Sequence, residues 1–412
     1  MPGMAELTGD SLSASLVRAA FLAQTRWKAL HTRTARAYLQ YHALAASLEL
    51  FKAGSVVPWV SYLFPTEILT SHGLTPMIPE VGSATLTGSD LREAVENAAA
   101  RMSLARDVCS YHRTALAAVE NGMLPAPTMC LGTTPLCLGK ECLLEMLATR
   151  YGVPFREIRV PLPPDEGEAP PAVVAEVAEQ IRELHEDIGR WTGRRPDLRR
   201  AVLLSNRAAK AWGDLMAERL AGRLELNGRK TFAIVFLGQL LWGTEAGAKD
   251  FERLLTERGR SDLVPPAFDG RRPKRLLWLH TVPHHDHAFF ELMEKQGAYV
   301  VFEEMGQMHQ ELIDPDDPWP GLARRLTDHT LWGTSARRAR LNIALAKKLR
   351  ADGAIHFNHW GCRHGLGSLP VVRAAFIEAG IPFLAIDGDA LARGGPNQEK
   401  ALQQLESFLE LL

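Results

Sequence analysis

The stretch Gly353-Ala-Ile-His-Phe-Asn-His-Trp-Gly-Cys-Arg-His-Gly-Leu-Gly-Ser368 is central to the interpretation of this chain. Its apolar opening predicts a short buried strand, and the glycines that follow predict a turn that carries Cys362. Ser368 is the predicted cap of a helix that continues to Ala379. A thiol beside glycines at the carboxyl end of a parallel strand stands where open α/β sheets place their functional groups.

Strand-like segments alternate with helical ones in two parts of the chain. The predicted strands cover residues 55–62, 75–79, 127–134 and 152–160 in the first part and 275–280, 298–302, 354–357 and 382–386 in the second. The pattern is almost wholly helical between the two parts, and further helices are predicted over 12–51, 91–108, 138–151 and 397–412. This alternation favours parallel sheets. The predicted fold class is therefore α/β, with two Rossmann-like, doubly wound lobes joined by a helical middle segment.

Two proline-rich junctions, at residues 161–171 and 264–273, mark where the pattern changes. We use them to divide the chain into four predicted units. These are an N-terminal helical segment (1–53), a first α/β lobe (54–163), a helical linker region (164–263) and a second α/β lobe (264–412).

Composition narrows the possible functions of these 412 residues. Lys plus Arg (47) nearly balances Asp plus Glu (48), so no general attraction to nucleic acid or to an anionic membrane is expected. The longest apolar runs are too short to cross a bilayer, and no three-part signal peptide opens the chain. Five cysteines at wide spacing argue against a disulfide framework. Reduced thiols in a cytoplasmic protein are predicted instead.

Three of the cysteines, Cys109, Cys137 and Cys362, stand at predicted junctions of loops with helices. Thiolates are the usual protein ligands of iron–sulfur clusters, and a helix amino terminus stabilises a thiolate. Spacing alone leaves two interpretations open, which are one shared iron–sulfur cluster or three buried free thiols. Cys130 lies inside a predicted strand, and Cys142 shares a helical stripe with apolar neighbours. Both are therefore predicted to belong to the core.

Other polar groups allow weaker hypotheses. The histidines of residues 280–287 could suggest a zinc site, but they lack the regular spacing of one and are more typical of a polar loop after a strand. Glu303 and Glu304 close another predicted strand, where a carboxylate pair could serve acid–base chemistry or simply face solvent. The glycines beside Cys362 allow backbone N–H groups to approach a phosphate or a cluster sulfide, although tight turns also need glycine.

Several short motifs resemble the 2-hydroxyacyl-CoA dehydratase D-component family, which includes benzoyl-CoA reductase subunits and double-cubane-cluster proteins. The resemblance runs from about residue 50 to the end of the chain. It rests on Pro65-Thr-Glu-Ile-Leu69, Asp107-Val-Cys-Ser-Tyr111, Thr133-Thr-Pro-Leu-Cys137, His359-Trp-Gly-Cys-Arg363, Gly380-Ile-Pro-Phe-Leu384, Asp387-Gly-Asp389 and Phe408-Leu-Glu-Leu-Leu412. The chain departs from the family pattern at Leu138, at Ala392-Arg393 and at Gln403-Gln404.

The resemblance implies two Rossmann-like lobes around a 4Fe–4S cluster held by Cys109, Cys137 and Cys362. It also implies removal of water from an (R)-2-hydroxyacyl-CoA through a ketyl radical, after an ATP-dependent iron–sulfur activator delivers one electron. The expected partner is a related second subunit in a heterodimer, with a homodimer as the alternative. Two other functions stay open. One is a low-potential reductase of the benzoyl-CoA or double-cubane kind, and the other is a non-catalytic partner subunit.

Residues near the expected cluster are the candidate catalytic and substrate-binding groups. His359, His364 and Arg363 flank Cys362 and are predicted to orient the thioester or the leaving hydroxyl, while an arginine also suits a CoA phosphate. The predicted substrate-binding residues are Glu67, Trp360 and His284.

Overall fold

The computed structural model describes residues 23–412 apart from 103, 106, 135, 260–262, 269, 271, 308–310 and 393–396. The predicted N-terminal helix is described only from residue 23, and its earlier part lies outside the described residues. The described part is not one continuous helix. It breaks at Arg33, which has a φ of 52°, and resumes as α2 (Ala35–Glu49). Thr34 caps the amino terminus of α2, because its hydroxyl accepts a hydrogen bond from the backbone N–H of Ala37.

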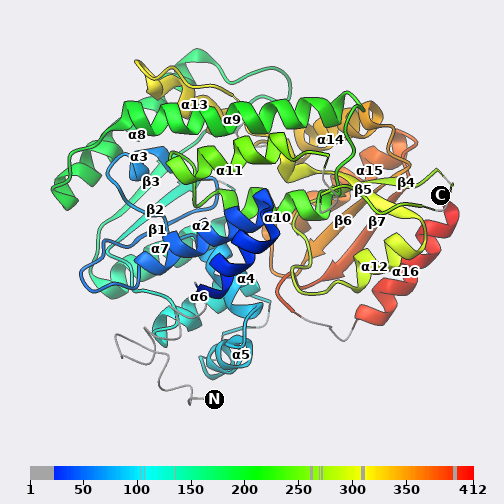
Figure 1. The fold of residues 1–412 in the computed structure, drawn as a ribbon, viewed down its shortest axis with the longest axis horizontal. Coiled ribbons are helices and arrows are strands. Elements are labelled where there is room, and N and C mark those ends of the chain that lie inside the picture. The colour runs from blue at the N-terminus through cyan, green and yellow to red at the C-terminus, as the bar shows by residue number, and fades with distance from the viewer. Residues whose placement is uncertain are drawn as a thin grey trace.

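The first sheet has three parallel strands in sequence order, β1 (Pro58–Val60), β2 (Met129–Thr134) and β3 (Phe155–Arg159). The helices of this region are α3 (Glu67–Thr70), α4 (Pro79–Thr87), α5 (Arg92–Arg101), α6 (Ser110–Glu120) and α7 (Leu138–Tyr151). Helix α7 ends at Gly152, which takes the left-handed conformation common after a helix. Figure 1 shows this sheet with α3 and α7 at the left of the molecule, and α4 and α5 toward the lower middle.

The second sheet has four parallel strands in the order β5-β4-β6-β7. The strands are β4 (Lys274–Leu279), β5 (Ala298–Glu303), β6 (Gly353–His359) and β7 (Phe383–Gly388). After β5 the chain returns to the opposite side of β4, so the strand order reverses between β4 and β6. Open α/β sheets bind ligands beyond the carboxyl ends of the strands at such a reversal. The first sheet has no reversal among its described strands.

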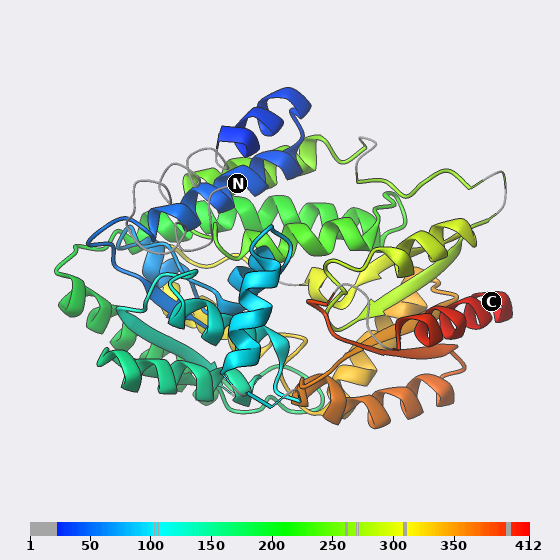
Figure 2. The same cartoon turned by 90° about the horizontal axis from the view of Figure 1, so that it is seen from below.

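The helices of the second half complete this layer. They are α12 (Ala288–Lys295), the short 3₁₀ helix η2 (Glu304–Gln307), α13 (Pro318–Thr327), α14 (Ser335–Leu349), α15 (Arg363–Glu378) and α16 (Gln398–Leu411). Helix α14 packs on α15, which packs on β6, while α16 packs on α12 and β7. Figure 2 shows the two sheets on opposite sides of the molecule.

The described part of the predicted middle segment forms four helices. They are α8 (Pro171–Thr192), α9 (Leu198–Leu220), α10 (Gly228–Gly238) and α11 (Glu245–Thr256). Helix α9 contacts the first half through Ser205, which donates to Glu67, and the second half through a buried ion pair of Arg219 with Glu303. One hydrophobic core includes Val60 of β1 and Leu276 of β4. The predicted helical middle is thus confirmed, and the division into two separate Rossmann-like lobes stays a prediction.

Three further predicted elements differ from the structure. Residues 75–79 form a single bridge between Met77 and Trp59 rather than a strand, because α4 begins at Pro79. The helix predicted over 91–108 ends at Arg101. The helix after β6 begins at Arg363 with Cys362 as its cap, so the predicted start at Ser368 is wrong. The glycines there suggested a longer turn, yet only Gly361 has a positive φ, and the later two are helical.

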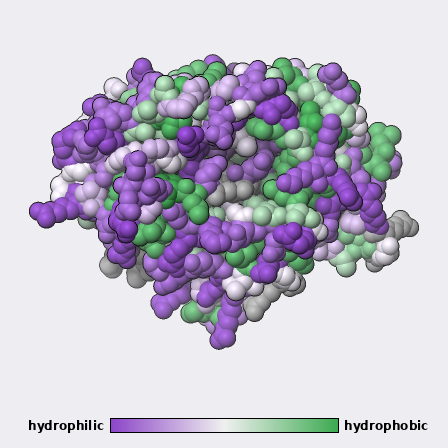
Figure 3. Space-filling view, turned by 90° about the horizontal axis from the view of Figure 1, so that it is seen from above, coloured by the Kyte–Doolittle hydropathy of each residue, from purple (hydrophilic) through white to green (hydrophobic). Residues whose placement is uncertain are grey.

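Within the described ranges, no helix is both long and apolar enough to cross a membrane. Figure 3 shows hydrophilic residues over most of one face, with apolar residues in separate groups.

A buried histidine predicts how stability changes with pH. His185 of α8 is 8% exposed and lies beside His72, and burial followed by the charge of His72 lowers the pKa of His185 to about 4. The unfolded chain binds the proton with a pKa of about 6.5, so this histidine destabilises the fold as pH falls below about 6.5. Between pH 7 and pH 5 we expect it to remove about 1–2 kcal/mol of stability.

The variant His185→Gln should show a smaller drop in thermal unfolding midpoint between pH 7 and pH 5 than the unmodified chain. His31→Gln serves as the control, because His31 is exposed at the surface. Equal drops in the His185→Gln variant and the unmodified chain would contradict the prediction.

Candidate functional site

Each of the three predicted ligand cysteines stands at the amino terminus of a helix. Cys109 caps α6, Cys137 caps α7 and Cys362 caps α15. Cys137 follows the end of β2 by three residues, and Cys362 follows the end of β6 by the same distance. Exposed N–H groups and the helix dipole at such positions favour a negatively charged sulfur. The local sequence therefore presents three thiols in the same way.

The fold brings these three thiols together although they are far apart in sequence. A charge on Cys362 or Cys137 raises the pKa of Cys109, and a charge on Cys362 raises the pKa of Cys137, so the three sulfurs lie near one another. The backbones of Gly361 and Cys109 are in close contact, because a Cβ on Gly361 would lie 2.4 Å from the Cys109 nitrogen. The start of α6 also reaches the second half through Ser110, which donates to Asp389 at 2.6 Å. The prediction that the three cysteines meet at one place is consistent with these contacts.

Each sulfur contacts a histidine ring from another element. The distances between Sγ and Nε2 are 3.3 Å for Cys109 and His359, 3.3 Å for Cys362 and His280, and 3.7 Å for Cys137 and His112. Where the ring nitrogen that faces the sulfur carries a hydrogen, it donates to the sulfur, and such bonds orient and stabilise a metal-bound thiolate. The site is thus a set of three thiol–histidine pairs.

The three thiols differ in acidity. Burial, followed by the charges of the other two thiols, raises the pKa of Cys109 well above its usual range. Burial raises the pKa of Cys137 to about 11. Burial also opposes ionisation of Cys362, but His280 outweighs it and lowers the pKa of Cys362 to about 7. Cys362 is therefore the thiol that loses its proton most easily.

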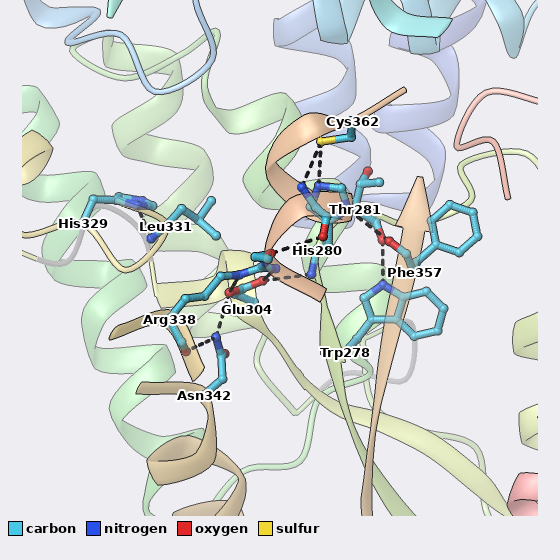
Figure 4. A network of polar contacts seen from close by, with 12 residues as sticks. Trp278, His280, Thr281, Glu304, His329, Leu331, Arg338, Asn342, Phe357 and Cys362 are labelled. Atoms are coloured by element: carbon cyan, nitrogen blue, oxygen red, sulfur yellow. Dashed lines mark hydrogen bonds and ion pairs between the residues drawn. The ribbon is translucent and has the colours of Figure 1, made fainter. Parts of the chain in front are cut away.

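A buried ion pair supports His280, as Figure 4 shows. His280 has a φ of 69°, a conformation that a residue other than glycine seldom adopts and that is often found at functional sites. Its backbone N–H donates to Glu304 at 2.9 Å, and its Nδ1 contacts the Phe357 carbonyl at 3.0 Å. Arg338 binds Glu304 through two bonds of 2.6 and 2.7 Å and also donates to the Ser368 hydroxyl. These contacts hold the strained turn that aims the ring at Cys362.

Burial opposes the charge on Glu304, but Arg338 and the His280 N–H more than offset it and hold the pKa of Glu304 well below its usual range. Both Glu303 and Glu304 are fully buried, so the alternative of a solvent-facing strand end is wrong. Each carboxylate has its own arginine, Arg219 or Arg338, and the pair therefore serves as two structural anchors.

Small residues allow the close packing around the sulfurs. A Cβ on Gly139, in the first turn of α7, would lie 2.9 Å from Nδ1 of His112. A Cβ on Gly365, in the first turn of α15, would lie 2.8 Å from the His280 ring. Glycine at both positions therefore lets the histidine ring approach the helix terminus that carries the cysteine.

Two of the predicted catalytic residues line a pocket beside Cys362. Arg363 and His364 border a cavity of about 200 Å³ together with Arg338 and with the hydroxyl residues Thr334, Ser335 and Ser368. The pocket lies where the amino termini of α14 and α15 meet, and neither helix has an acidic residue in its first turn. Positive side chains and helix amino termini together favour an anion.

The remaining predicted site residues lie in different surroundings. His359 is buried against Cys109. His284, which belongs to the second half, contacts the Tyr111 hydroxyl with its Nε2 at 2.8 Å. Trp360 borders a separate small cavity of about 30 Å³. Glu67 lies in a buried cluster where its carboxylate accepts from Ser205 and forms an ion pair with Arg325. The structure thus gathers His359 and His284 near the thiols and places Glu67 in another network.

The other two cysteines lie outside the group of three. Cys130 is fully buried in β2, which confirms its predicted core position. Cys142 is exposed, so its predicted core position is wrong. Helix α7 buries the face of Leu143, Leu144 and Leu147 instead, and leaves the predicted stripe at the surface. No group of three or more His, Cys, Asp or Glu side chains suited to a single metal ion is found in the described part of the chain, the histidines of 280–287 included.

Sequence reasoning missed several residues of the site. His112 and Arg338 received no role, His280 was considered only for a zinc site, and Glu304 only as part of a carboxylate pair. His112 stands three residues after Cys109, which is a local signal. Arg338 and Glu304 meet only through the fold, because 34 residues separate them.

Packing at Gly361 yields a prediction about stability. Gly361 has a φ of 77°, and a Cβ there would overlap the Cys109 backbone, so Gly361→Ala should lose at least about 2 kcal/mol of stability. Gly367→Ala is the matched control, because Gly367 is helical and has nothing within 4 Å of the new Cβ. The control should be neutral or gain about 0.5–1 kcal/mol. Similar thermal unfolding midpoints for the two variants would contradict this account.

Comparisons with known proteins match most of the chain. The family model described as 2-hydroxyglutaryl-CoA dehydratase, D-component, matches residues 61–412 and so includes all three cysteines. The (R)-phenyllactyl-CoA dehydratase alpha subunit of Clostridium sporogenes is 23% identical over 360 residues, which cover 83% of this chain and 86% of that protein. The chain belongs to the 2-hydroxyglutaryl-CoA dehydratase D-component family.

Proposed function

We propose that this chain is the iron–sulfur subunit of a 2-hydroxyacyl-CoA dehydratase, which removes water from an (R)-2-hydroxyacyl-CoA through a ketyl radical after one-electron activation. The observation that carries the proposal is the convergence of Cys109, Cys137 and Cys362 from three helix amino termini, each sulfur paired with a histidine. Membership of the dehydratase family and the likeness to a phenyllactyl-CoA dehydratase subunit support it.

The donor set suits a 4Fe–4S cluster. The three soft sulfurs are close enough for a charge on one to raise the pKa of another, which supports a common centre for them. When bound, such a cluster supplies a one-electron couple and an iron without a cysteine ligand that can polarise a substrate oxygen. The chain's own contribution is to present the thiols at positive helix ends, to supply the neighbouring histidines and to bury Cys109 away from water.

The pocket beside Cys362 is our candidate for one end of the acyl-CoA. Its volume of about 200 Å³ is smaller than most pockets for whole ligands, so it would hold one charged part of the molecule. Arg363 and the amino termini of α14 and α15 suit a phosphate group of CoA. A phosphate anchored there would place the rest of the ligand close to the helix that carries Cys362.

The relative's name as an alpha subunit supports a multi-subunit dehydratase. We propose a related second subunit as the partner, with a homodimer as the alternative, and an ATP-dependent iron–sulfur activator as the electron donor. The proposed location is the cytoplasm. A double-cubane reductase would need more thiolates, but Cys130 is enclosed in β2 and Cys142 lies at the surface, so no observation favours it.

Counting iron tests the proposal. Protein purified without oxygen should contain about four iron atoms and about four sulfides per chain, with a Mössbauer spectrum of a 4Fe–4S cluster. Supplied with the partner subunit and the activator, it should dehydrate an (R)-2-hydroxyacyl-CoA. Absence of iron after anaerobic reconstitution would refute the cluster. Iron without activator-dependent turnover would instead support a non-catalytic subunit.

Cysteine variants identify the ligands. Cys109→Ala, Cys137→Ala and Cys362→Ala should each lose most of the iron, because a thiolate ligand is removed. Cys142→Ala should keep the iron content of the unmodified chain, since this exposed thiol lies outside the group. Iron loss in all four variants, or in none, would contradict the assignment.

Replacing the exposed arginine of the pocket tests acyl-CoA binding. Arg363→Gln should weaken acyl-CoA binding roughly tenfold, because one charge-assisted bond to phosphate is lost, and should leave the iron content unchanged. Arg373→Gln is the matched control, because Arg373 is an exposed arginine of the same helix outside the pocket lining. Calorimetric titration with acyl-CoA measures both, and equal affinities would remove Arg363 from the proposed site.

A further inference from the structure

His359 occupies a fixed position between a backbone amide and a thiol. It is the last residue of β6, and its side chain is 1% exposed. Its Nδ1 accepts a hydrogen bond from the Ala390 N–H at 3.1 Å, and its Nε2 lies 3.3 Å from Sγ of Cys109. The ring of Tyr111 packs edge-on against it with 5.3 Å between centroids. These contacts leave His359 little freedom to turn toward a substrate.

The backbone contact determines which ring nitrogen carries the proton. An imidazole nitrogen that accepts a hydrogen bond has no hydrogen of its own, and the ring always keeps at least one proton. Since Nδ1 accepts from Ala390, Nε2 carries the hydrogen and donates to the Cys109 sulfur. His280 differs, because its Nδ1 contacts a carbonyl oxygen and must carry the hydrogen there. Of these two histidines, only His359 donates to sulfur as a neutral ring.

A hydrogen bond to a ligand sulfur changes the reduction potential of the cluster that the sulfur would hold. Reduction adds negative charge that spreads onto the ligand sulfurs, and an N–H donor is attracted more strongly to that charge. The donor therefore stabilises the reduced form relative to the oxidised form and raises the reduction potential. Because the site is buried, water cannot replace the donor without rearrangement.

We propose that His359 is a positioning residue that donates its Nε2 hydrogen to Cys109 and thereby makes the cluster easier to reduce. The proposal rests on the proposed function, in which Cys109 is a cluster ligand. It replaces the earlier hypothesis that His359 orients the thioester, since both ring nitrogens already have partners. The consequence is that the chain itself sets part of the energy an external one-electron donor must supply.

Two variants separate the donor from the shape of the side chain. His359→Asn places an oxygen where Nδ1 was, so the Ala390 N–H keeps an acceptor while the donor to sulfur is lost. His359→Gln extends an N–H to the position of Nε2 and should restore the donor. The midpoint potential is measured by redox titration followed by electron paramagnetic resonance, together with iron content. For the Asn variant we expect about a tenfold higher oxidised-to-reduced ratio at the wild-type midpoint, which is about 59 mV for one electron.

His329→Asn is a matched control. His329 also accepts a backbone N–H at Nδ1, from Leu331 at 3.1 Å, and its buried Nε2 has no hydrogen-bond partner in the part of the chain that the structure describes. It should keep the wild-type potential. The proposal would be supported if the reduction potential falls in His359→Asn but not in His329→Asn, and if His359→Gln returns to the wild-type value. Equal potentials in the two His359 variants and the wild type, or equal shifts in His359→Asn and His329→Asn, would overturn it.

A measurement on the metal-free chain keeps this proposal distinct from the proposed function. Nuclear magnetic resonance of protein with ¹⁵N-labelled histidine reports which ring nitrogen is protonated, and the His359→Gln variant identifies the signal. We expect hydrogen on Nε2. Hydrogen on Nδ1 would overturn the role of His359 even if the chain binds a cluster. Absence of iron in the wild type would refute the cluster itself, and the claim about reduction would fall with it, whatever the tautomer.

Discussion

The contact of the Gly361 backbone with that of Cys109 is the constraint on which the site depends. It joins the turn after β6 to the start of α6, two segments about 250 residues apart. Only glycine fits there, because a Cβ on residue 361 would lie 2.4 Å from the Cys109 backbone nitrogen. The positive φ of Gly361 also sets the direction of the turn into α15. Cys362 therefore reaches the same place as Cys109 through backbone packing rather than through a bond between side chains.

Around that contact the molecule repeats one local arrangement three times. A cysteine caps a helix, a histidine from another element contacts its sulfur, and, beside Cys137 and Cys362, a glycine in the first turn of the helix leaves room for the ring. The support for the rings differs, since His280 is held by the Arg338–Glu304 pair and His359 by the Ala390 N–H. The sulfurs also differ in acidity, because burial raises the pKa of Cys109 while His280 lowers that of Cys362.

Much of the fold followed from sequence patterns, because strands and helices bury their side chains with different periods. Helix α7 was predicted with its observed ends, and seven of the eight predicted strands correspond to observed strands. The failures have local causes. Residues 75–79 form only a single bridge. The helical glycines were mistaken for a turn, which concealed the true start of α15. The stripe with Cys142 was assigned to the wrong face because α7 buries Leu143 and Leu147 instead.

The sequence by itself determined most of the helices and strands, and the family motifs singled out Cys109, Cys137 and Cys362. Those features depend on neighbours a few residues away, which the sequence displays directly. Only the tertiary structure decided which histidine faces which sulfur, that Glu67 lies in a network with Arg325, and that Glu304 supports His280. These contacts arise between segments distant in sequence, and local propensity carries no information about such distances.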